Sequence, residues 1–168
     1  MDVYEAVRTV LAVRSYADSP VPRATIDRIV EAGRLTGSSM NGQPWHFVVV
    51  ENRDTLRRMG ELARSGPYIA QAAFAIAVAI EESPYSVSDG SRAIQSMILT
   101  AWAEGVASNW VGFLGPDTIK PLLGIPPELH LLGIIPFGYP VQAAGQGKKK
   151  RKPLAQVVHS ERFGQPYG

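Results

Sequence analysis

Residues 37–50 read GSSMNGQPWHFVVV, and this stretch decides the fold. It begins with small and polar residues, passes through Pro44 and Trp45, and ends in four apolar residues. Aromatic and β-branched residues in a row are typical of a buried strand. A polar loop fixed to a rigid strand is a common way to present hydrogen-bonding groups to a ligand. We therefore predict a buried strand over residues 47–50 and a binding loop directly before it.

Helical periodicity marks several segments on either side of this stretch. An early helix over residues 3–13 is capped by Asp2, and a short helix is expected over residues 117–123. Apolar residues recur at steps of three and four over residues 88–104, which predicts the longest helix. Two further helices are predicted from residues that share one face. The inner face of the first consists of Ile26, Ile29, Val30 and Gly33. The second follows the cap Asn52, and its inner face consists of Leu56, Met59, Leu62 and Ala63.

Apolar runs predict the remaining strands. Residues 74–80 read FAIAVAI and residues 129–137 form a second run, while residues 106–114 suggest a strand or a strand-like loop. A short apolar segment over residues 68–73 precedes the first of these. Helices and strands alternate only loosely, which favours an α+β arrangement of one sheet flanked by helices.

The composition indicates one globular domain. The chain has 168 residues, of which 45% are hydrophobic and 19% are charged, and it contains no cysteine. No apolar run reaches the length of a membrane span, and the first residues do not resemble a signal peptide, so we expect a cytoplasmic protein that binds no membrane. The net charge is +2, but five basic residues at positions 148–152 leave the rest of the chain at −3.

The common catalytic motifs are missing from the sequence. His46, His130 and His159 lie far apart and outside any zinc or serine-hydrolase motif, and cysteine nucleophiles are excluded. No glycine-rich phosphate loop is present either. If the protein is an enzyme, a bound cofactor should therefore carry the difficult chemistry, and no side chain is nominated as catalytic.

The segment SSMNGQPWHF resembles the loop-to-strand signature of the nitroreductase family, and the likeness extends over nearly the whole chain. The resemblance implies an α+β fold with a mostly antiparallel sheet flanked by helices, in an intertwined homodimer. It also implies FMN as cofactor and NAD(P)H as reductant. Electrons would pass by a ping-pong mechanism to a small-molecule acceptor such as a nitroaromatic or a quinone.

The same resemblance assigns residues to the FMN site. Ser38, Ser39 and Asn41 match positions that contact FMN from the partner subunit, while Arg14 would lie near the pyrimidine edge of the flavin. In SNWVGF, Trp110 would pack near the ring and the Gly112 N–H would approach flavin N5, where a glycine allows close contact. Lys149 and Arg151 match the phosphate-binding pair of the C-terminal ending.

The chain departs from the family pattern at the phosphate end. Val10, Leu11 and Ala12 stand where the family has Arg, Arg and Ser, and Gly37 replaces a proline. The missing arginine and serine would grip the phosphate of FMN. Spacing alone leaves open whether Arg8 replaces them and whether another flavin-like cofactor binds instead.

Three alternatives accompany this interpretation. Relatives of the family include oxidases, dehalogenases and flavin-fragmenting enzymes, and the lost motif also fits a flavin carrier or redox sensor without turnover. The basic run at residues 148–152 fits a nucleic-acid patch, although no other basic stripes accompany it, so we expect no nucleic-acid partner. Residues 141–168 should form an extended arm that packs on the partner, because Leu154, Val157, Val158 and Phe163 need apolar surface.

Overall fold

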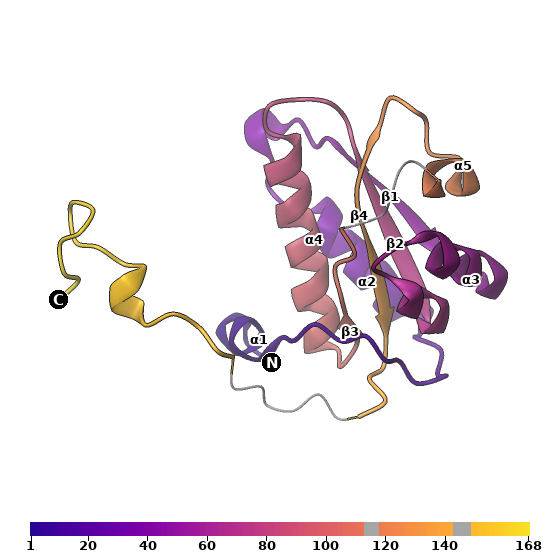
Figure 1. The fold of residues 1–168 in the computed structure, drawn as a ribbon, viewed down its shortest axis with the longest axis horizontal. Helices are drawn as coiled ribbons and strands as arrows, with labels where there is room; N and C mark the ends of the chain where they lie inside the picture. The colour runs from indigo at the N-terminus through magenta and orange to yellow at the C-terminus, as the bar shows by residue number, and fades with distance from the viewer. Residues whose placement is uncertain (113–117, 143–148) are drawn as a thin grey trace.

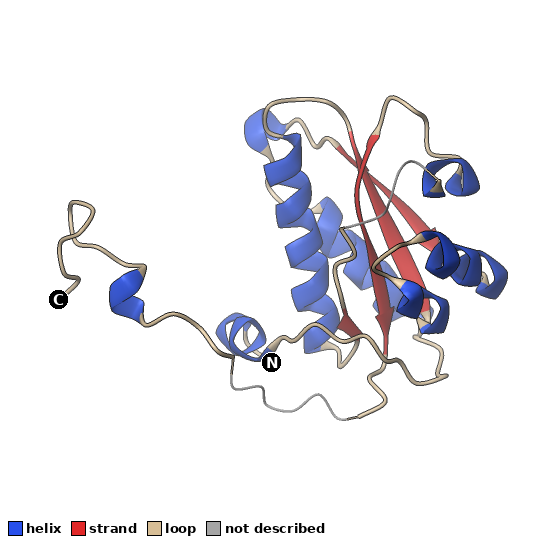
Figure 2. Cartoon of the chain, viewed as in Figure 1, coloured by secondary structure: helices blue, strands red, loops and turns tan. Residues whose placement is uncertain are grey.

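The computed structural model describes residues 1–112, 118–142 and 149–168, and it arranges them as helices on both faces of one sheet (Figures 1 and 2). The α-helices are α1 (Val3–Thr9), α2 (Arg23–Arg34), α3 (Arg53–Leu62), α4 (Ser86–Ala103) and α5 (Ile119–Leu123). The strands are β1 (Trp45–Val50), β2 (Phe74–Ile80), β3 (Ala107–Ser108) and β4 (His130–Gly138). Short 3₁₀ helices are η1 (Ser39–Asn41), η2 (Pro67–Gln71) and η3 (Leu154–Gln156).

The sheet has the order β1-β2-β4-β3, and all of its neighbouring strands are antiparallel. The predicted α+β class and antiparallel sheet are therefore confirmed. The expectation of a fully buried strand after the polar loop is wrong in one respect: β1 starts at Trp45 and is an edge strand, with Val49 exposed. It has β2 on one side only, because the sheet ends there.

β2 explains why the two faces of the sheet carry different layers. Successive side chains of a strand point to opposite faces, and in β2 the large and small residues alternate. Phe74, Ile76, Val78 and Ile80 pack with α2 and α4, whereas the alanines between them pack with α3 and α5. Because both faces are covered, every residue of β2 is buried.

The predicted helix caps are present. Asp2 accepts a hydrogen bond from the Glu5 N–H at 2.8 Å, and Asn52 accepts one from the Thr55 N–H at 3.0 Å. Each side chain satisfies a donor that the first helical turn leaves unpaired.

The first helix is shorter than predicted, because α1 ends at Thr9 rather than near Val13. Val10 is already extended, and Ala12 forms a parallel bridge with Ser108. The Val13 N–H donates to the Ser108 carbonyl at 2.9 Å instead of continuing the helix. A contact with a distant strand therefore overrides the local helical pattern.

Two further predicted segments differ from the structure. The first part of the apolar segment at residues 68–73 belongs to η2, which ends at Gln71. The predicted strand over residues 106–114 is reduced to β3 and an isolated bridge between Val111 and Ile134. The end of that prediction and the start of the short helix predicted over residues 117–123 lie outside the described residues.

The C-terminal segment, residues 149–168, extends away from the helices and the sheet (Figure 1). Its apolar side chains are open to solvent: Phe163 is 92% exposed and Leu154 is 64% exposed. The α1 side chains Val3, Tyr4 and Val7 are exposed as well. Within residues 1–112, 118–142 and 149–168, none of the helices has the length and apolar character needed to cross a bilayer.

Candidate functional site

A cavity of about 810 Å³ opens between α1, α4, the segment that follows β3, and the start of the C-terminal arm. We call it the basic cavity because Arg8, Lys149 and Arg151 are among its described lining residues. The others are Tyr4, Val7, Val10, Leu11, Ala12, Gln95, Ile98, Ser108, Asn109 and Trp110. It thus brings residues from both ends of the sequence to the flank of α4.

Lys149 joins the arm to α1. Its ammonium donates to the Val7 carbonyl at 2.6 Å, and Arg151 donates to the Lys150 carbonyl at 3.1 Å. Partial burial lowers the pKa of Lys149, and the positive charge of Arg151 lowers it further. Both cations line the basic cavity, where their combined positive charge favours an anionic group.

Arg8 is held by its neighbour on α1. Its guanidinium donates to both carboxylate oxygens of Glu5, at 2.9 and 2.8 Å. This hydrogen bonding lowers the pKa of Glu5 and raises the pKa of Arg8. Arg8 therefore reaches the basic cavity with its charge partly balanced, whereas Lys149 and Arg151 repel each other.

Long-range contacts fix the walls of the basic cavity. The Trp102 indole N–H donates to the Thr9 hydroxyl at 2.9 Å, which ties the end of α1 to the end of α4. The indole of Trp110, which lines the cavity, lies against Gly133 of β4, where a Cβ atom would come within 2.5 Å of it. Only glycine permits this approach. With Ile98, Trp110 gives the cavity an apolar side.

Arg14 lies in a neighbouring hollow of about 420 Å³, lined by residues 12–15 and 140–142. The two hollows share Ala12, so residues 10–15 form a continuous wall. Tyr16 anchors this wall to the sheet: its hydroxyl lies 2.8 Å from the Val13 carbonyl and 3.2 Å from that of Pro136. Burial raises the pKa of the Tyr16 phenol, so this group stays a hydrogen-bond donor.

The serine loop, residues 38–43, lies at the other end of α4. Figure 1 shows η1 beside the first turns of α4 and α1 beside its last turns. Ser39 contacts Asp89, while the α4 lining residues of the basic cavity are Gln95 and Ile98, which lie six and nine residues further on, or about 9 and 14 Å along the axis. The structure therefore does not bring the serine loop to the basic cavity of the same chain.

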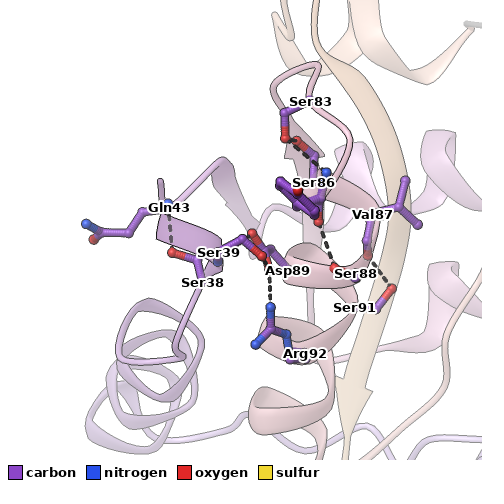
Figure 3. A network of polar contacts seen from close by, with 11 residues as sticks. Ser38, Ser39, Gln43, Ser83, Ser86, Val87, Ser88, Asp89, Ser91 and Arg92 are labelled. Atoms are coloured by element: carbon purple, nitrogen blue, oxygen red, sulfur yellow. Dashed lines mark hydrogen bonds and ion pairs between the residues drawn. The ribbon is translucent and has the colours of Figure 1, made fainter. Parts of the chain in front are cut away.

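The serine loop has an unusual backbone. Met40, Asn41 and Gln43 have φ angles of 50°, 55° and 48°, in the left-handed region that residues other than glycine seldom adopt. Inside the loop, the Gln43 N–H donates to the Ser38 hydroxyl at 2.9 Å, as seen in Figure 3. Strained backbone of this kind gathers at functional sites.

The sequence predictions are thus distributed over three places. Trp110, Lys149 and Arg151 meet in the basic cavity, Arg14 is in the neighbouring hollow, and the serine loop is distant. Gly112 is exposed and does not line the basic cavity. Of the basic run, Lys148 lies outside the described residues.

Sequence reasoning missed some lining residues and one contact of the serine loop. Gln95 lies one helical turn before Ile98 on the same face of α4, a spacing that could have identified it. Asn109 donates to the Tyr68 hydroxyl, and Asp89 contacts Ser39, which is 50 residues away. Nothing in the sequence marks these two long-range partners.

In the described part of the chain, no group of three or more His, Asp or Glu side chains could hold a metal ion. The sequence lacks cysteine throughout.

A profile of the nitroreductase family matches residues 8–85 and 67–139, which together are most of the chain. The chain belongs to the nitroreductase family. The resemblance seen in the sequence is therefore confirmed, and the protein is an oxidoreductase of the group that contains NAD(P)H nitroreductases and FMN reductases.

Individual nitroreductase-family proteins support this assignment. A protein of Methanothermobacter thermautotrophicus, provisionally named NADH dehydrogenase/NAD(P)H nitroreductase, is 34% identical over 86% of this chain and 81% of its own length. The FMN reductase [NAD(P)H] of Bacillus subtilis is 27% identical over 90% of this chain and 70% of its own. A provisionally assigned nitroreductase of Desulfovibrio desulfuricans, solved in complex with FMN, superposes with a TM-score of 0.85 at 27% identity, covering 97% of this chain and 98% of the other.

Proposed function

We propose that this chain binds FMN and transfers electrons from NAD(P)H to nitroaromatics, quinones or similar electron-poor acceptors by a ping-pong mechanism. The observation that carries the proposal is the basic cavity, which combines an apolar wall with three cations in a nitroreductase fold. The relatives named NAD(P)H nitroreductase and FMN reductase supply the reductant and the cofactor class.

The residues of the basic cavity fit a flavin mononucleotide. Its volume of about 810 Å³ lies in the range of cofactor sites. Trp110 and Ile98 offer apolar surface to a planar ring, and Lys149 and Arg151 offer donors to a phosphate. When bound, FMN supplies the hydride chemistry that no side chain of this protein can perform.

The proposed site residues serve different parts of FMN. Lys149 and Arg151 hold the phosphate, and Arg8 takes the place of the absent family arginine. Arg14 places a fixed positive charge near the pyrimidine edge, where negative charge develops on reduction. The Gly112 N–H approaches flavin N5. No side chain is assigned the role of general acid.

A complete site in this proposal needs two copies of the chain. Ser38, Ser39 and Asn41 do not line the basic cavity of their own chain, and their contact with α4 is at Asp89, more than one turn before Gln95, so a partner subunit presents them. The exposed apolar residues of α1 and of residues 149–168 support the same homodimer, because a partner would cover them. The arm hydrogen-bonds to α1 through Lys149, whose ammonium donates to the Val7 carbonyl.

Coexpression of two defective chains tests the shared site. K149Q/R151Q removes two of the three cavity cations of one chain, and S38A/S39A alters the serine loop of the other. A heterodimer of these variants has one intact site and one doubly altered site. We expect the differently tagged heterodimer to bind about one FMN per two chains. If each site belonged to a single chain, the heterodimer would bind FMN no more tightly than the homodimers of the two variants do.

The catalytic part of the proposal is tested by turnover. Purified protein loaded with FMN should oxidise NADH or NADPH through many cycles per flavin when a nitroaromatic or quinone is present. Initial rates measured while both reactants are varied should give the parallel double-reciprocal lines of a ping-pong mechanism.

A flavin carrier or redox sensor is the second candidate function. Val10, Leu11 and Ala12 favour it, because they line the basic cavity where the family has phosphate-binding residues. A carrier would bind FMN and accept electrons once, with no sustained oxidation of NAD(P)H by any acceptor. Stopped-flow reduction followed by steady-state assays with several acceptor classes separates the two functions.

A further inference from the structure

The serine loop is attached to α4 by one buried carboxylate (Figure 3). The Asp89 side chain is 2% exposed. Its Oδ2 accepts a hydrogen bond from the Ser39 N–H at 3.0 Å, and its Oδ1 accepts one from the Ser39 hydroxyl at 3.2 Å. Asp89 thus binds both the backbone and the side chain of one loop residue.

Burial of Asp89 is balanced locally. A buried carboxylate is unfavourable unless charge and hydrogen bonds compensate for its lost hydration. Arg92, one turn further along α4, donates to Oδ1, and its own side chain is half exposed. Asp89 is therefore satisfied within the fold and needs no ligand of its own.

The loop has a conformation that requires such an attachment. Met40, Asn41 and Gln43 are all left-handed, and the Met40 side chain is 90% exposed, so its packing does not fix the backbone. Hydrogen bonds from the N–H groups of Asn41 to Ser38 and of Gly42 to Ser39 stay within the loop. They shape the loop but do not fix its place on the protein, whereas the Asp89 contacts do.

We propose that Asp89 is a positioning residue that holds the serine loop in the strained conformation in which Ser38, Ser39 and Asn41 meet FMN. The inference rests on the proposed FMN-binding function and deepens it. Asp89 acts through Ser39 and does not touch the cofactor. Its removal weakens FMN binding because the free loop must be ordered again at each binding event.

The chain contains a matched control for this test. Asp54 and Arg57 on α3 have the same residue types and the same three-residue spacing as Asp89 and Arg92, and they too form an ion pair, at 3.3 Å. The Asp54 side chain, however, is 82% exposed. A change at Asp54 therefore removes an aspartate–arginine pair without touching the serine loop.

The experiment compares wild-type protein with D89A, D89N and D54A. FMN affinity is titrated by quenching of flavin fluorescence, the visible circular dichroism of bound FMN is recorded at saturation, and amide hydrogen exchange of residues 38–43 is measured without FMN. We expect D89A to bind FMN about 10- to 100-fold more weakly, D89N to be intermediate, and D54A to match wild type.

The loop readouts separate positioning from a general loss of stability. Exchange in residues 38–43 should rise in D89A while exchange in β2 stays unchanged, and the dichroism of bound FMN should change because the loop no longer fixes the ring. Wild-type affinity with unchanged loop exchange in both Asp89 variants overturns the inference. A wild-type protein that takes up no FMN is a different failure, since it overturns the proposed function and the inference with it.

Discussion

The serine loop and the basic cavity are the two parts of the proposed FMN site, and they differ in how the fold supports them. The serine loop has the polar residues expected of the family and is attached to the core through the buried Asp89. The basic cavity has lost the family's Arg-Arg-Ser residues, and its cations Arg8, Lys149 and Arg151 lie on exposed or half-exposed segments.

This difference shows where the site tolerates change. A loop with three left-handed residues that is held on α4 through Asp89 should lose its geometry when that anchor is removed. A phosphate group can be bound by cations that approach from several directions, because charge attraction is less directional than an anchored loop. In the proposed site, cations from α1 and the arm can therefore take over from the family's Arg-Arg-Ser residues, whose positions are occupied by Val10, Leu11 and Ala12.

The largest effect is expected from removing the cations of the arm. K149Q/R151Q deletes the two proposed charge-assisted hydrogen bonds to phosphate, each worth about 1.5–3 kcal/mol, so FMN affinity should fall about 150- to 25,000-fold. Isothermal titration with FMN and with riboflavin measures this loss. Riboflavin lacks the phosphate, so the variant should bind it as wild type does.

K150Q/K152Q is the matched control, because it removes the same charge from alternate positions of the same run. Neither residue lines the basic cavity, so FMN affinity should be unchanged. The pair also tests nucleic-acid binding by residues 148–152, since a salt-sensitive complex would depend on all of these charges. Equal loss of FMN binding in both double variants would contradict the assigned phosphate pair.

Restoring the family's arginine and serine at positions 10 and 12 should make the basic cavity match the family pattern, as the serine loop already does. V10R/A12S places an arginine and a serine where the family has them, next to the existing cations. FMN should bind about 10- to 100-fold more tightly, because two donors are added to the phosphate. Equilibrium dialysis measures the gain, and L11M serves as a control that adds no donor. Weaker binding in V10R/A12S would mean that the phosphate lies elsewhere.

Substitutions at Arg8 and Glu5 should change FMN affinity by smaller amounts and in opposite directions. R8Q should weaken FMN binding about tenfold through loss of one charged donor. E5Q should strengthen binding a few-fold, because the Arg8 guanidinium no longer divides its hydrogen bonds between Glu5 and the phosphate. Fluorescence titration of both variants measures the changes. Identical affinities in R8Q, E5Q and wild type would exclude Arg8 as the substitute for the lost arginine.

The smallest effect concerns the wall between the two hollows. Y16F removes the hydroxyl that contacts the Val13 and Pro136 carbonyls and should lower the free energy of unfolding by about 1 kcal/mol. Urea unfolding measures this change. Y167F is the control, since Tyr167 is exposed on the arm and its loss of a hydroxyl should leave stability unchanged. A Y16F protein as stable as wild type would show that the hydroxyl contributes nothing to this wall.

Sequence reasoning predicted the fold best where one segment determines its own structure. β2 and α4 were found because long apolar patterns mark both. The end of α1 was misplaced because the Val13 N–H is bound by Ser108, which lies 95 positions further along the chain. The edge position of β1 depends on strand order, which no local pattern contains.

The sequence predicted part of the candidate site. The family motifs identified Trp110, Lys149 and Arg151, which do meet in one cavity, although they come from distant parts of the chain. Arg14 and Gly112 were assigned by the same motifs, yet they lie outside that cavity. Asp89 escaped prediction because an aspartate in the first turn of a helix is common, and only the folded chain places it against Ser39.

The most direct test of the central claim is the visible absorption spectrum of the freshly purified protein, with the released chromophore identified by mass. We predict the two visible bands of oxidised flavin and one FMN per chain, which agrees with a site at each basic cavity. A colourless protein that also fails to take up added FMN would contradict the account. The cations of α1 and the arm would then not replace the missing Arg-Arg-Ser residues.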